Sequence, residues 1–166
     1  NDVIFGVVDR LTLRSEDGDL NGIQAVPAGY DLGGCKQTLL GTIKINRSEV
    51  DGFRIGLITS MKGGAQVDVN YNTFTNNFSD TVFSNSNQVT YIVGNKFFGT
   101  PPAEDSGYLS VVIGTTSDDA PNQSKFIVTG NTFDIDATDF TTAYGVYFEQ
   151  LSKVADLTAL VVANTF

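Results

Sequence analysis

The sequence contains no histidine and only one cysteine, Cys35. Without histidine, the chain cannot build a Ser-His-Asp triad, a Cys-His dyad or a histidine-ligated metal site. A single cysteine excludes an intrachain disulfide framework and a cysteine-based zinc site. The longest apolar runs, such as 109–114 and 159–163, are far too short to cross a bilayer, so we expect no membrane insertion.

Basic residues are also scarce. The chain has 10 lysine and arginine residues against 19 aspartate and glutamate residues, which gives a net charge of −9 and a pI near 4.2. This charge argues against nucleic acid or an anionic membrane surface as a partner. Glycine, asparagine, threonine and serine are abundant, and only 17% of the residues are charged. This composition is usual for β-rich, turn-rich secreted or cell-surface proteins, so we expect that location.

What the chain does contain is a short signature that occurs four times. The copies are VDVNYNTF at 67–74, TYIVGNKF at 90–97, FIVTGNTF at 126–133 and ALVVANTF at 159–166. A weaker copy, IKINRSEV at 43–50, has Ser48 in place of the last asparagine. The intervals between copies are unequal, whereas the signature is constant. The pattern predicts one structural unit that is repeated with loops of different length.

Each full copy places residues of one kind at fixed positions around its last asparagine. A β-branched residue stands three positions before it and a phenylalanine two positions after it. The candidate corner residues are Asn72, Asn95, Asn131 and Asn164. The candidate core residues are Val69, Ile92, Val128 and Val161 together with Phe74, Phe97, Phe133 and Phe166.

These positions have a simple physical interpretation. Apolar residues at every second position, such as Phe126 and Val128, place one face of a short strand inward. The asparagine tolerates a left-handed or turn conformation, and the phenylalanine then returns to the interior. Stacked about 4.8 Å apart, such coils would put asparagine over asparagine and phenylalanine over phenylalanine in internal ladders.

At the level of this repeat, the chain resembles a right-handed parallel β-helix of the pectin-lyase-like superfamily, in which N-x-F corners are common. The resemblance covers roughly residues 40–166. It implies an all-β solenoid of about five to six coils. It concerns architecture, which enzymes, phage spikes and adhesins share, and so it does not decide the function.

We predict a single β-helix domain over residues 1–166. Residues 1–38 are expected to form an irregular first coil, and residues 39–166 are expected to form regular coils. Long loops are predicted at 99–107, 117–125 and 134–143. A helix-like spacing of leucine and valine over 151–160 competes with a strand there, but the last copy of the signature favours the strand.

No catalytic residue is assigned. The NTD, GHG and RIK signatures of the glycoside-hydrolase branch of the superfamily are missing. The lyase branch typically combines carboxylates that hold calcium with a basic proton acceptor, and Lys44, Arg54 and Asp68 match that set in residue type alone. These three residues and an outward-facing Phe98 are the candidate polysaccharide contacts. For Lys44 and Arg54, the alternative is that they are solvated basic side chains on the outer faces of strands.

Two acidic segments are candidates for weak calcium binding, because hard oxygen ligands cluster in them. One contains Glu16, Asp17 and Asp19, and the other contains Asp134, Asp136 and Asp139. The full EF-hand spacing is absent from the first, and a solvated turn is the alternative there. No other cofactor is predicted.

Two classes of function remain. The first is a non-catalytic extracellular or cell-surface β-helix with a structural or adhesive role, as an adhesin, passenger segment or filament subunit. The second is part of a carbohydrate-active β-helix enzyme, either a polysaccharide lyase or a glycoside hydrolase. We favour the first because the catalytic signatures are absent.

The last copy of the signature ends at Phe166 without a polar cap, which suggests a fragment or an uncapped subunit. We therefore expect as partners further coils of the same chain or other copies joined end to end. Polysaccharide is a further candidate partner.

Overall fold

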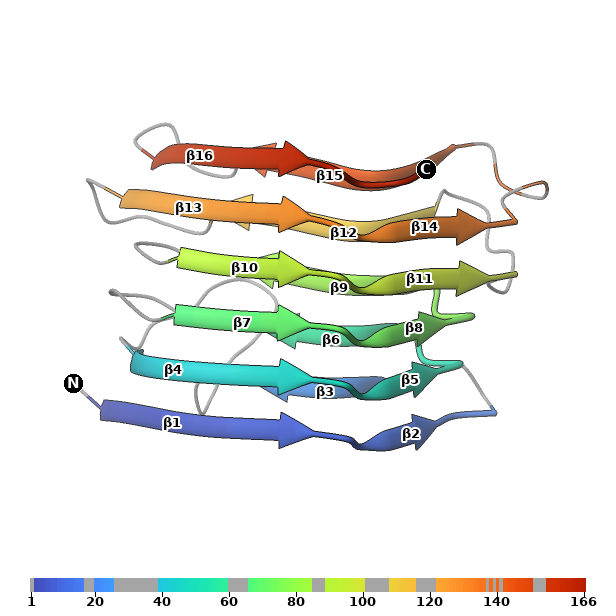
Figure 1. Cartoon of the computed structure of the whole chain (residues 1–166), viewed down its shortest axis with the longest axis horizontal. Coiled ribbons are helices and arrows are strands. Elements are labelled where there is room, and N and C mark those ends of the chain that lie inside the picture. The colour runs from blue at the N-terminus through green and yellow to red at the C-terminus, as the bar shows by residue number, and fades with distance from the viewer. Residues whose placement is uncertain are drawn as a thin grey trace.

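The computed structural model describes residues 2–16, 20–25, 39–59, 66–84, 89–100, 108–115, 122–136, 138, 140, 142–150 and 155–166. These residues form sixteen strands and the turns between them (Figure 1). They include no helix that is long and apolar enough to span a lipid bilayer. The chain is therefore all-β over its described part.

The strands make three sheets, which we call A, B and C. Sheet A contains β1 (Asp2–Asp9), β4 (Leu39–Asn46), β7 (Gln66–Asn70), β10 (Val89–Val93), β13 (Asn122–Thr129) and β16 (Ala155–Val162). Sheet B contains β2 (Thr12–Arg14), β5 (Glu49–Asp51), β8 (Thr73–Thr75), β11 (Lys96–Gly99) and β14 (Thr132–Ile135). Sheet C contains β3 (Asn21–Ala25), β6 (Ile55–Thr59), β9 (Ser79–Ser84), β12 (Tyr108–Thr115) and β15 (Ala143–Gln150).

Each strand pairs in parallel with the strand three places later in the chain. We call three successive strands, one from each sheet, a coil. Figure 1 shows the coils as successive levels, with β1 at one end and β16 at the other. The molecule is thus a solenoid-like stack, and parallel pairing puts equivalent positions of the repeat directly over one another.

The first coil is more regular than the sequence predicts. Strands β1, β2 and β3 pair in register with β4, β5 and β6, although residues 1–38 lack the signature. Val8 and Leu13 pack against the hydrophobic core at positions that valine and phenylalanine occupy in later coils. The signature is absent because Leu11 takes the corner position of the asparagine. Aliphatic residues therefore complete a coil that the N-x-F pattern does not reveal.

The predicted loops differ from the structure at their boundaries. The predicted loop 99–107 begins one residue too early, because Gly99 is the last residue of β11, and residues 101–107 lie outside the described residues. The predicted loop 117–125 is too long, because β13 begins at Asn122 and pairs along its length with β16. The segment 134–143 connects β14 to β15 and contributes residues to the ends of both strands. Residues 155–162 form a strand, as the last copy of the signature predicts.

The corner between sheets A and B bends at the residue before the asparagine position. That residue has a φ angle between 49° and 65° in six successive coils, where it is Arg10, Arg47, Tyr71, Gly94, Gly130 or Ala163. The sequence predicts a left-handed or turn conformation for the asparagine, but the left-handed residue is the one before it. The asparagine instead turns its side chain into the protein, where it bonds to the neighbouring coils.

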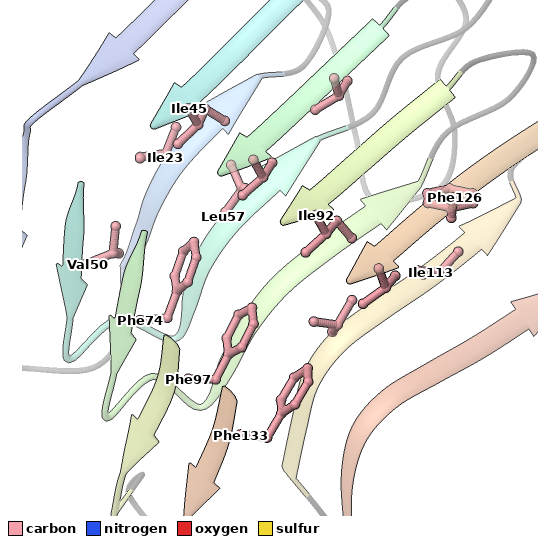
Figure 2. Packing of buried hydrophobic residues seen from close by; sticks show 14 of the residues in the cluster. Ile23, Ile45, Val50, Leu57, Phe74, Ile92, Phe97, Ile113, Phe126 and Phe133 are labelled. Carbon is pink, nitrogen blue, oxygen red and sulfur yellow. The ribbon is translucent and has the colours of Figure 1, made fainter. Parts of the chain in front are cut away.

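Apolar side chains fill the space between the sheets (Figure 2). One column runs through sheet A and consists of Ile45, Val69, Ile92 and Val128, all fully buried. A second runs through sheet B and consists of Val50, Phe74, Phe97 and Phe133. The centroids of neighbouring rings are 5.2 Å apart for Phe74 and Phe97 and 4.9 Å apart for Phe97 and Phe133. The aromatic column is therefore continuous.

Glycine in sheet C makes room for this aromatic column. A Cβ atom at Gly56 would lie 3.1 Å from Cδ1 of Phe74. At Gly145, a Cβ atom would lie 2.6 Å from Cε1 of Phe166. The rings thus fit because the facing strands carry no side chain at these two positions.

The last coil departs from the predicted core. Phe166 extends the column, with its ring centroid 4.9 Å from that of Phe133, but it is 74% exposed. Val161 pairs with Val128 and is 38% exposed. The prediction that these two side chains are interior is wrong, because no further coil covers them within the described residues.

Candidate functional site

A ladder of asparagine side chains joins the coils from inside the corner. The backbone N–H of Asn72 donates to Oδ1 of Asn95 at 2.9 Å, and the Nδ2 group of Asn72 donates to the same atom at 3.0 Å. Asn95 donates to Oδ1 of Asn131 in the same two ways, at 2.9 and 3.0 Å. Each Nδ2 group also donates to a carbonyl of the preceding coil, such as Ile45 for Asn72 and Val69 for Asn95. One amide side chain therefore links three levels of the stack.

The ladder has a direction, since each corner residue donates from its backbone N–H to the next coil. It begins where Leu11 N–H donates to Oγ of Ser48, and Ser48 N–H donates to Oδ1 of Asn72. It ends where Asn131 donates to Oδ1 of Asn164. The Asn164 Nδ2 group donates to the carbonyl of Val128, but no acceptor faces the Asn164 backbone N–H in the described part of the chain. The last coil therefore presents an open donor next to the exposed ring of Phe166.

The outer face of sheet A carries a second feature, a hollow of about 300 Å³ that we call the sheet A hollow. Its lining consists of Gln66, Asp68, Asn70, Tyr71, Tyr91 and Val93. The first three alternate along β7, and their register partners on β10 include Tyr91 and Val93. Alternation directs these residues outward because Val67, Val69 and Ile92 occupy the buried face. The hollow is thus built from two adjacent strands and the corner residue Tyr71.

The sheet A hollow contains one polar side chain that is held by a hydrogen bond and one whose oxygen atom has no partner within the described residues. The Nε2 group of Gln66 donates to Oδ1 of Asp68 at 2.8 Å, and Asp68 is 9% exposed. The Oδ1 atom of Asn70 is buried and has no hydrogen-bond partner among the residues that the structure describes. A buried polar atom without a partner is uncommon in a folded protein. The hollow therefore combines one oriented carboxylate, one unpaired amide oxygen and two phenol rings.

The structure brings together only part of the predicted polysaccharide contacts. Lys44 on β4 is the register partner of Asp68 on β7, so both lie on the outer face of sheet A. The described residues show no ion pair between them. Arg54 precedes β6 at the corner between sheets B and C, where its carbonyl accepts from the N–H of Ser79. Arg54 therefore does not join the other two, and the lyase-like set is not assembled.

Phe98 lies on a different sheet from the hollow. It follows the buried Phe97 on β11, is 39% exposed and pairs with Thr75 and Asp134 in sheet B. It is thus an isolated aromatic residue on an outer strand face.

The two candidate calcium segments are described only in part. Asp17, Asp19 and Asp139 lie outside the described residues, and within them no group of three potential metal ligands occurs. Asp136 accepts hydrogen bonds from the side chain and the backbone of Thr138, at 2.6 and 3.2 Å. These two bonds lower the pKa of the Asp136 carboxyl below its usual value. The Asp136 segment is thus a turn that the aspartate itself organises.

Sequence reasoning missed Gln66, Asn70, Tyr71 and Tyr91 as site residues. One signal was available, because Tyr71 stands where glycine or alanine precedes the corner asparagine in the other full copies. A left-handed backbone conformation costs free energy for a tyrosine, and such strained residues are enriched at functional sites. The other three show no such signal, since their proximity depends on strand register.

Comparison of the chain with protein-family models, with curated proteins and with solved structures finds no match.

Proposed function

We propose that this chain is a non-catalytic, secreted or cell-surface structural protein, built as a right-handed parallel β-helix of the pectin-lyase-like type. Parallel strands joined by a crossover are right-handed in nearly every known case, which supports the handedness. The observation that supports this proposal is the asparagine ladder, in which each backbone N–H donates to the next coil. The backbone N–H of the last member, Asn164, has no acceptor within the described residues. Such a ladder stiffens the stack and leaves one end ready to accept another coil.

The arrangement of charged residues supports the absence of catalysis. A lyase-type reaction needs a basic group beside the carboxylates that bind the substrate, and Arg54 lies on a different side of the coil from Asp68. We expect no unsaturated uronate product when the chain is incubated with pectin or alginate. The appearance of its ultraviolet absorbance, and its loss in an Arg54→Ala variant, would contradict the proposal.

The terminal coil fits one kind of partner better than another. A coil that stacks on β16 must supply an oxygen to the N–H of Asn164 and an apolar side chain to the ring of Phe166. An N-x-F corner supplies both, as it does within the chain. A second copy stacked by its first coil would present Leu11, whose side chain has no acceptor. We therefore favour a further coil with an N-x-F corner over end-to-end copies.

A chain extension tests this proposal directly. Residues 75–97 continue the chain from one corner to the next, so a duplicate of them appended after Phe166 would provide one further coil in register. We expect the extended chain to unfold at a higher urea concentration than the original. Hydrogen exchange at the Asn164 backbone N–H should slow at least tenfold, in line with an amide that becomes buried and bonded.

The matched control carries the same extension with alanine in place of the copied Asn95 and serine in place of the copied Phe97. It has the same length and nearly the same composition but lacks the ladder acceptor and the ring. We expect it to leave Asn164 exchange unchanged. Equal protection by both extensions would contradict the proposal, as would no protection by either.

A further inference from the structure

The walls of the sheet A hollow are aromatic. Tyr71 is 65% exposed, and its ring lies against Gly94 in the next coil, where a Cβ atom would stand 2.6 Å from Cε1 of Tyr71. Tyr91 is half-buried and projects from β10 beside Asp68. A phenol ring has an apolar face that packs against the C–H face of a pyranose ring and a hydroxyl group that forms hydrogen bonds. Two such rings at one hollow suit a sugar ring.

The polar lining suits hydroxyl groups. The Asp68 carboxylate is oriented by the hydrogen bond from Gln66 and retains acceptor capacity beyond that bond. Asn70 offers an amide whose oxygen has no partner within the described residues. A ligand hydroxyl can donate to the Asp68 carboxylate and can accept from the Asn70 Nδ2 group, whereas the Asn70 Oδ1 atom is buried below the surface of the hollow. The hollow therefore offers hydrogen bonds of both senses within a small area.

Charge decides which class of sugar fits. Asp68 is the only aspartate, glutamate, lysine or arginine in the lining, since Lys44 lies on the neighbouring strand outside it. The whole chain carries a net charge of −9. A uronate or sulfated sugar would place its negative charge beside a carboxylate on an acidic protein, which is unfavourable. A neutral sugar has no such penalty.

We propose that the sheet A hollow binds a neutral sugar residue of a polysaccharide, with Tyr71 and Tyr91 as stacking walls and Asp68 and Asn70 as hydroxyl partners. The volume, about 300 Å³, lies at the lower end of the range for ligand sites and accommodates a short part of a glycan. The hollow is open, so the rest of the glycan continues along the outer face of sheet A. This inference goes beyond the structural role, and it does not depend on what stacks on the terminal coil.

The test uses the full chain, labelled with ¹⁵N, and four neutral probes: glucan, galactan, mannan and xylan hexasaccharides. Oligogalacturonate of the same length is the charged probe. We expect at least one neutral probe to give saturable chemical shift changes that centre on residues 66–71 and 91–94. Oligogalacturonate should give none at the same concentration.

Three variants locate the contact. Tyr91→Ala should weaken binding of the neutral probe about fivefold to tenfold, which is the usual value of one aromatic contact. Tyr91→Phe should retain most of the affinity, because it keeps the ring. Asp68→Asn should weaken binding about tenfold by removing a charged acceptor while preserving shape.

The control is Phe98→Ala, which removes a partly exposed aromatic residue from an outer strand face of sheet B. It should leave the affinity unchanged, and the dispersion of each amide spectrum reports whether the variant is folded. The proposal is overturned if no neutral probe shifts the hollow residues, if oligogalacturonate binds as tightly as the neutral probe, or if Phe98→Ala weakens binding as much as Tyr91→Ala.

Discussion

The ring of Tyr71 occupies the space that a side chain at Gly94 would need, one coil further along the stack. A Cβ atom at Gly94 would lie 2.6 Å from Cε1 and 2.7 Å from Cδ1 of Tyr71. Gly94 also has a φ angle of 65°, which residues with a Cβ atom adopt at a cost. The two residues thus depend on each other, and the position of the Tyr71 ring at the sheet A hollow depends on the absence of a side chain at Gly94.

We predict that Gly94→Ala destabilises the chain by about 2–3 kcal/mol, from backbone strain and displacement of the Tyr71 ring. Gly130→Ala is the matched control, because Gly130 has the same φ angle of 65° but its Cβ atom would meet only the Gly94 nitrogen at 3.9 Å. It should cost about 1 kcal/mol. Urea unfolding measures both. In a Tyr71→Ala background the excess cost of Gly94→Ala should vanish, and its persistence would show that the ring is not the cause.

The aromatic column gives a second prediction. Phe97 is fully buried between Phe74 and Phe133, so Phe97→Ala should lower the free energy of unfolding by about 3–5 kcal/mol. Phe166 is 74% exposed and has one ring neighbour, so Phe166→Ala should cost only about 1 kcal/mol. Chemical denaturation of the two variants provides the comparison. If the two variants lost the same free energy of unfolding, burial within the aromatic column would not be the source of the stability at Phe97.

A third prediction concerns the turn at Asp136. Hydrogen bonds from Thr138 lower the pKa of the Asp136 carboxyl, so its charged form is favoured in the folded chain. The stabilising effect is present above the unfolded pKa and is lost as the pH falls through the lower folded pKa. Titration of the carboxyl ¹³C signal should give a midpoint below that of an ordinary aspartate. Thr138→Ala should raise the midpoint, and an unchanged midpoint would exclude Thr138 as the cause.

The repeat could be predicted from the sequence because parallel stacking converts spacing along the chain into contact between coils. The positions of Phe74 and Asn95 within the signature determine that each meets its own kind one coil away. The first coil could not be predicted in this way, since Leu11 and Leu13 fill the corner and core positions without the signature.

The candidate site was only partly visible in the sequence for a related reason. Lys44 and Asp68 could be assigned to successive coils, and the structure makes them register partners. The sheet A hollow depends on the direction in which the Tyr71 ring turns after a left-handed residue, which local sequence does not determine. The exposure of Phe166 depends on what stacks above it, and the signature is the same whether or not a coil is present.

The last prediction concerns the asparagine ladder. A substitution there tests the contribution of hydrogen bonds apart from that of the packed core. Asn95→Ala would remove the acceptor of two bonds from Asn72 and the donor to Val69 and Asn131. The buried backbone N–H of Asn72 would then lack a partner, and such a loss costs about 1–3 kcal/mol for each group left unsatisfied. We expect Asn95→Ala to cost about 3–4 kcal/mol in total, measured by urea unfolding.

Asn164→Ala is the matched control at the end of the ladder. Asn164 is only partly buried, and water can reach the groups that it leaves behind, so the expected cost is about 1 kcal/mol. Hydrogen exchange adds a readout that packing alone would not change. In Asn95→Ala, the Asn72 backbone N–H should exchange much faster, while the N–H of Thr73, which donates to the carbonyl of Ser48, should stay protected. Equal acceleration at both amides would mean that the coil opens as a whole, and the ladder would then not be the element that holds the corner.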